Sequence, residues 1–105
     1  MQAQPFIEDL SRVGKQVLPK DASLWLYGSR ARGNAHDGSD WDVLILLNKE
    51  KQELNDFDEY SYPLIDFGAL NGEIVSAQIY TQKEWKSMSY TPFYKNVERD
   101  KIVIL

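Results

Sequence analysis

The sequence contains no cysteine and a single histidine among its 105 residues. The absence of cysteine excludes disulfides and thiolate metal sites, and it permits an intracellular location. His36 lies in a polar loop and is interpreted as a solvated residue rather than a catalytic base. An excess of basic residues is also absent, because 12 lysines and arginines against 16 acidic residues give a net charge of −4. A general nucleic-acid binder would carry a basic face, so this balance argues against that class.

Long apolar runs are missing as well. No stretch approaches the roughly 20 apolar residues that a membrane-spanning helix needs. Residues 1–9 lack the basic and apolar blocks of a signal peptide. We therefore expect a cytoplasmic protein without a membrane segment. The length corresponds to a single domain over residues 1–105, and the 43% hydrophobic content is sufficient for a modest core.

The most informative stretch is Leu24–Leu47, which reads as a strand, a small-residue turn, a short helix and a second strand. The first apolar run ends at Gly28 and Ser29. Gly28 allows the backbone to turn and a ligand to approach closely. Ser29 can cap the short helix, whose free N–H groups suit a phosphate. Arg30 and Arg32 follow on this helix, either as solvated residues or as partners of a triphosphate, because arginine forks match phosphate oxygens.

Asp40 and Asp42 open the second strand of this stretch. Residues two apart on a strand point to the same face, roughly 6.5–7 Å apart along it. Both carboxylates are therefore expected on one face, with Trp41 and Val43 on the other. Two carboxylates that leave coordination positions for phosphate oxygens are suited to Mg²⁺. The alternative is a pair of Asx turns at a strand start, but the phosphate-binding turn upstream favours a metal site.

The remaining sequence predicts further helices and strands around this stretch. The expected helices are Pro5–Val17, Asn48–Phe67 with a break near Ser61–Tyr62 caused by Pro63, a helix from a Thr81–Glu84 capping box through Trp85 and Met88, and one after Thr91–Pro92. The expected strands are Glu73–Tyr80 and Lys101–Leu105, the latter either an edge strand or a packed tail. Together these elements predict an α/β fold, in which a small mixed β-sheet is packed with helices.

Gly28-Ser29, ten intervening residues and then Asp40-Trp41-Asp42 resemble the Gly-Ser-x10-Asp-x-Asp signature of the minimal nucleotidyltransferases. These are small members of the polymerase-beta-like superfamily, and the resemblance extends more loosely over the whole chain. It implies a nucleotidyltransferase core and Mg²⁺-dependent transfer of AMP from ATP to a hydroxyl group.

The resemblance also implies the roles of individual residues and a partner. Asp40 and Asp42 would form the catalytic pair that holds Mg²⁺. Gly28 and Ser29 would position the triphosphate, and Arg30 or Arg32 would neutralise part of its charge. Many members are antitoxins that attach AMP to a tyrosine of a HEPN-domain ribonuclease toxin, which implies the same role here. The short chain fits a protein acceptor or a homo-oligomer, whereas small-molecule enzymes of the aminoglycoside type carry an additional helical domain.

The pattern departs from the superfamily at one position. Members usually add a third carboxylate from the neighbouring strand, and Ser76 aligns with that position. Glu73 is the nearest acid, but its odd offset of three residues favours the other face of the strand. The third acid normally helps to deprotonate the attacking hydroxyl. An alternative function is therefore a nucleotide-binding or partner-binding module whose catalysis has decayed.

Overall fold

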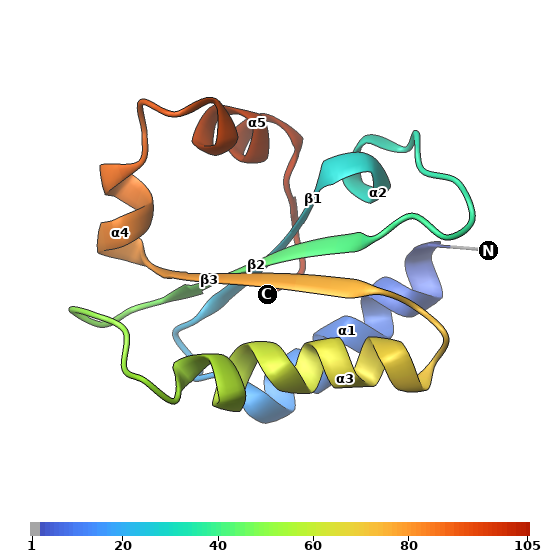
Figure 1. The fold of residues 1–105 in the computed structure, drawn as a ribbon, viewed down its shortest axis with the longest axis horizontal. Helices are drawn as coiled ribbons and strands as arrows, with labels where there is room; N and C mark the ends of the chain where they lie inside the picture. The colour runs from blue at the N-terminus through green and yellow to red at the C-terminus, as the bar shows by residue number, and fades with distance from the viewer. Residues whose placement is uncertain (1–2) are drawn as a thin grey trace.

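The computed structural model of the protein describes residues 3–105. Within these residues, four strands form one mixed sheet in the order β3-β2-β1-β4 (Figure 1). The strands are β1 (Ser23–Tyr27), β2 (Trp41–Leu47), β3 (Val75–Thr81) and β4 (Ile102–Val103). β1 is antiparallel to both β2 and β4, whereas β2 and β3 are parallel. The expected α/β fold with a mixed sheet is confirmed.

Helices cover both faces of this sheet (Figure 1). They are α1 (Ala3–Val17), α2 (Gly28–Arg32), the π-helix η1 (Phe57–Ser61), α3 (Tyr62–Leu70), α4 (Gln82–Ser87) and α5 (Pro92–Asp100). α1 and α3 lie on one face, α4 and α5 lie on the other, and α2 sits at the end of β1. No helix within residues 3–105 is long and apolar enough to cross a membrane.

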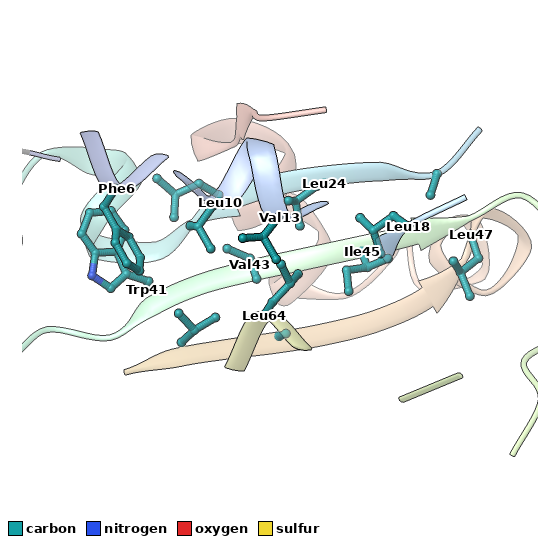
Figure 2. Packing of buried hydrophobic residues seen from close by; sticks show 14 residues of the cluster. Phe6, Leu10, Val13, Leu18, Leu24, Trp41, Val43, Ile45, Leu47 and Leu64 are labelled. Atoms are coloured by element: carbon teal, nitrogen blue, oxygen red, sulfur yellow. The ribbon is translucent and has the colours of Figure 1, made fainter. Parts of the chain in front are cut away.

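β2 is buried on both faces because its side chains alternate between two apolar clusters. Val43 belongs to the larger cluster between the sheet and helices α1 and α3, in which Leu10 and Leu64 are fully buried (Figure 2). Leu44 belongs to the smaller cluster, where it meets Trp85 of α4. The even-numbered residues of β2 therefore face α4 and α5.

The helix expected over Asn48–Phe67 begins later than predicted, because residues 48–55 form a loop. Asp56 holds this loop in place. Its buried carboxylate accepts hydrogen bonds from Lys49 Nζ at 2.8 Å and from the Glu53 backbone N–H at 2.7 Å. These local hydrogen bonds compete with a helix over the same residues.

Near the break expected from Pro63, the helix changes type but is not interrupted. η1 and α3 are continuous and join at Ser61–Tyr62. Pro63 lies in the first turn of α3, where a missing N–H is tolerated. α3 then continues to Leu70, past the expected end at Phe67.

The other predicted elements are confirmed with small shifts of their ends. α1 covers the expected Pro5–Val17, and α5 begins after Thr91, whose hydroxyl accepts from the Tyr94 N–H. Residues 102–103 of the C-terminal segment form an edge strand on β1 rather than an unpaired tail. β3 begins at Val75, so Glu73 precedes the strand.

The capping box predicted at Thr81 is present at the start of α4. Thr81 Oγ1 accepts from the Glu84 N–H at 3.0 Å, and Glu84 Oε1 accepts from the Thr81 N–H at 2.8 Å. Thr81→Ala is expected to lower the free energy of unfolding by about 1–2 kcal/mol, because the first turn loses its acceptor. Urea denaturation measures this loss, and Thr81→Ser should recover most of it. Equal losses in both variants would show that the buried methyl group, not the cap, is responsible.

Candidate nucleotide site

Three polar side chains form a row across the sheet at the end of β1. Asp42 is the antiparallel partner of Tyr27 on β1 and the parallel partner of Ser76 on β3. Partner residues on adjacent strands point to the same face, so this row lies on the side of α4 and α5. Trp41 faces the opposite way, where its ring contacts Phe6 with 4.5 Å between centroids (Figure 2). The predicted division of Asp42 and Trp41 between the two faces is confirmed.

Gly28 lets the Asp42 carboxylate approach the start of α2. Its φ of +74° lies in the left-handed region, and a Cβ at this position would overlap Asp42 Oδ2. The prediction that Gly28 turns the backbone is confirmed, whereas the close approach of a ligand stays a prediction. The group that approaches is a carboxylate of the chain itself.

The prediction that Ser29 caps the short helix is wrong. α2 begins at Gly28, the capping position falls on Tyr27, and no side chain caps the helix. Ser29 lies in the first turn, where its carbonyl accepts from the N–H groups of Gly33 and Asn34. Within residues 3–105 the Ser29 hydroxyl itself forms no hydrogen bond. It is therefore available to a ligand.

Asp40 and Asp42 carry negative charge that no ion pair neutralises within residues 3–105. Burial raises the pKa of Asp42, the charge of Asp40 raises it further, and Arg32 opposes the rise. Asp42 is half-buried and Asp40 is exposed. A divalent cation would relieve this repulsion, and carboxylate oxygens are ligands that Mg²⁺ prefers. The two residues therefore fit the predicted metal.

The third carboxylate that the resemblance implies has no equivalent beside Asp42. The register places Ser76 directly next to Asp42, as the alignment predicts. Glu73 lies elsewhere, because its Oε1 accepts from Trp41 Nε1 at 2.9 Å and lies 3.8 Å from Arg30 Nη2. In the described part of the chain, no three acidic, histidine or cysteine residues are grouped so that they could hold a metal. The chain itself supplies two carboxylates.

The two arginines of α2 have different surroundings. Arg30 is buried, with its side chain 8% exposed, and its Nε and Nη2 donate to the Ser39 carbonyl at 3.3 and 2.9 Å. Arg32 is 42% exposed and pairs with Asp100 at 3.3 Å. Its charge also acts on Asp42. The structure thus brings Arg32, rather than Arg30, to the carboxylates.

A pocket of about 180 Å³ opens between α2 and α5 beside this row of residues. Its lining consists of Tyr27, Gly28, Arg32, Phe93, Asn96, Val97 and Asp100. The Tyr27 and Phe93 rings meet edge to face at 5.6 Å. Burial, with the nearby charges of Asp42 and Tyr80, raises the pKa of Tyr27 to about 12, so its hydroxyl remains a donor at neutral pH. Sequence reasoning assigned no role to Tyr27 or to this face of α5.

The raised pKa of Asp42 has a consequence for stability without metal. The folded protein keeps the Asp42 proton to a higher pH than the unfolded chain does, so ionisation penalises the folded state. In EDTA, the unfolding free energy of the wild type should fall relative to that of Asp42→Asn as pH rises above the ordinary pKa of 3.8. The difference should then become constant. Urea denaturation between pH 3.5 and 7 measures it, and a difference independent of pH would contradict the prediction.

Residues 7–104 match the nucleotidyltransferase domain family, so the chain belongs to that family. Nucleotidyl transfer is the general reaction of this class. The chain is also similar to a solved structure described as a crystal structure of a toxin-antitoxin with AMP-PNP. That match has 17% identity and a TM-score of 0.64, and covers 93% of this chain and 72% of the other. Such low identity shows a shared fold. No curated protein sequence matches the chain.

Proposed function

We propose that the protein is a Mg²⁺-dependent nucleotidyltransferase that transfers AMP from ATP to a hydroxyl group and releases pyrophosphate. The observation that carries this proposal is the position of Asp42. Its half-buried carboxylate has no ion-pair partner in the described residues, lies against Gly28 and experiences the charge of Asp40. Membership of the nucleotidyltransferase domain family supports the reaction class. The preference for ATP comes from the resemblance to the minimal nucleotidyltransferases.

Asp40 and Asp42 are the residues that would hold Mg²⁺, which when bound neutralises charge on the reacting phosphates. The Ser29 hydroxyl donates to a phosphate oxygen, and Gly28 admits the Asp42 carboxylate to the start of α2, beside which the triphosphate would lie. Arg32 contributes a positive charge from the exposed side of α2. These side chains would orient the α-phosphate toward the acceptor oxygen. The bond from that oxygen to phosphorus forms as the bond to pyrophosphate breaks.

The proposed acceptor is a tyrosine of a HEPN-domain toxin, with this protein as its antitoxin. The resemblance to the minimal nucleotidyltransferases supports this acceptor. The similar solved structure, a toxin-antitoxin with AMP-PNP, agrees with a nucleotide and a toxin partner. Ser76 provides no carboxylate beside Asp42, so we propose that a group outside this row deprotonates the tyrosine.

The test is transfer of label from α-labelled ATP, in the presence of Mg²⁺, to a co-expressed HEPN-domain protein. We expect label on a partner tyrosine with the wild type and none with Asp40→Asn/Asp42→Asn. Label on a different acceptor would keep the transferase and remove the antitoxin role. Failure to bind or modify any HEPN-domain protein encoded next to this one would contradict the antitoxin role.

The second candidate function is a nucleotide-binding or partner-binding module without catalysis. Ser76 favours it, because the described residues contain no third carboxylate for the site. This candidate predicts Mg²⁺-dependent ATP binding with no transferred label. It also predicts that inhibition of a toxin partner survives Asp42→Asn. Both results differ from those expected of the transferase.

A further inference from the structure

Arg30 packs against Trp41, on the face of β2 opposite to Asp42. Its guanidinium lies 4.3 Å from the centre of the Trp41 ring. Trp41 belongs to the larger apolar cluster, on the face of β2 that α1 and α3 cover. The side chain is 8% exposed. Burying a guanidinium is costly unless its charge and N–H groups are paired. The partners of Arg30 therefore indicate what the residue does.

The main partner of Arg30 is the peptide that leads into Asp40. Both Nε and Nη2 donate to the Ser39 carbonyl, at 3.3 and 2.9 Å. This carbonyl belongs to the same planar peptide unit as the Asp40 nitrogen. Arg30 thus links α2 by hydrogen bonds to the backbone directly before Asp40.

The sheet holds Asp42 but does not hold Asp40. Asp42 pairs with neighbours on both sides, on β1 and on β3. Asp40 precedes β2 and is exposed, and it follows a loop in which Gly33 and Gly38 have positive φ. The strand ladder can therefore set the position of the Asp42 backbone, whereas Asp40 depends on contacts of its adjacent residues.

Glu73 completes the cluster around Arg30. Its Oε1 accepts from Trp41 Nε1 at 2.9 Å and lies 3.8 Å from Arg30 Nη2. The Trp41 backbone N–H donates to the Ile74 carbonyl at 2.8 Å. Arg30, Trp41 and Glu73 thereby connect α2, the start of β2 and the segment before β3. The contacts of Ser39 with Arg30 and of Trp41 with Glu73 and Ile74 hold the two residues on either side of Asp40.

We infer that Arg30 is a positioning residue that holds Asp40 beside Asp42, and that it controls the affinity of the pair for a divalent cation. The inference rests on the proposed function in one respect, namely that these two carboxylates bind the metal. It assigns Arg30 a different role from the phosphate contact expected from the sequence. Arg32 remains the arginine for the phosphates.

The experiment compares Arg30→Met, which keeps a long apolar stem over Trp41, with Arg30→Lys, which keeps the charge without the forked donor. Arg32→Met is the matched control in the same helix. Binding of Mn²⁺ without nucleotide is followed by electron paramagnetic resonance of the free ion. Order at Asp40 is followed without metal by its ¹H–¹⁵N heteronuclear NOE, with Val43 of β2 as the internal reference.

We expect Arg30→Met to weaken Mn²⁺ binding about tenfold, as is typical when a residue supporting a metal ligand is lost. The NOE of Asp40 should fall while that of Val43 is unchanged, and Arg30→Lys should recover part of both losses. Arg32→Met should bind Mn²⁺ at least as tightly as the wild type, because it removes a competing positive charge. If Arg30→Met folds poorly, Arg30→Lys alone should still show the weaker binding.

Wild-type Mn²⁺ affinity in both Arg30 variants would overturn the inference, even with lower thermal stability, because the residue would then be merely structural. An unchanged NOE at Asp40 would overturn it as well. A wild type that binds Mn²⁺ no better than Asp40→Asn/Asp42→Asn would instead contradict the proposed function. In that case the metal-free NOE still decides whether Arg30 holds Asp40.

Discussion

Asp42→Asn is expected to reduce AMP transfer by about 10²–10³-fold, as removal of one preorganised electrostatic group typically does. Asparagine keeps the shape of the side chain beside Gly28 but loses the charge that would hold the metal. The unfolding free energy of the variant in EDTA should equal or exceed that of the wild type at pH 7. Burial and the charge of Asp40 raise the pKa of Asp42, so its ionised form is disfavoured in the folded protein.

Label transfer and urea denaturation on the same preparations measure the two effects of Asp42→Asn. Asp58→Asn is the matched control, because Asp58 is an exposed acid in η1 on the opposite side of the sheet. It should leave both transfer and stability unchanged. Transfer at the wild-type rate in Asp42→Asn would exclude a catalytic role for this carboxylate. Collapse of the fold would instead point to a structural role.

Much of the stretch Leu24–Leu47 could be predicted because its signals are local. A continuous apolar run indicates a strand buried on both faces, and the two-residue period places Asp42 and Trp41 on opposite faces. The capping box at Thr81 is equally local. The cap at Ser29 could not be predicted correctly, because the left-handed backbone of Gly28 makes the turn and moves the capping position to Tyr27.

The features that sequence reasoning missed depend on contacts between distant residues. Arg30 and Arg32 are two positions apart on α2, and their spacing does not tell which one is buried over Trp41. The pocket beside Tyr27 is lined by residues of α2 and α5, and no local sequence pattern shows that these two helices lie together. Loop 48–55 likewise depends on buried Asp56. Tertiary packing decides such cases and overrides the helical spacing of apolar residues.

Ser76→Asp is expected to increase AMP transfer about tenfold. This gain is smaller than the roughly 10²–10⁴-fold that a well-placed general base contributes. Ser76 is the direct neighbour of Asp42 on β3 and shares its face of the sheet. An aspartate there would complete the carboxylate trio that the resemblance implies and bind the metal more tightly. The Mg²⁺ concentration for half-maximal transfer should therefore fall.

The same substitution should destabilise the protein without metal. A third negative charge would repel Asp42. The pKa of Asp42 is already raised by burial and by the charge of Asp40. Urea denaturation in EDTA should show a lower unfolding free energy, and Mg²⁺ should restore it. Ser76→Asn is the control, because it has the shape of aspartate without its charge and should gain neither activity nor metal affinity.

The result for Ser76→Asp separates the two candidate functions. If the wild type transfers AMP and the variant is faster, the missing carboxylate limits an active enzyme. If the wild type binds ATP without transfer and the variant gains activity, the module has lost its catalysis at Ser76. An active wild type whose rate does not change in Ser76→Asp would contradict the prediction. It would show that the base proposed outside this row is sufficient by itself, and the proposed toxin partner would be the next place to search for it.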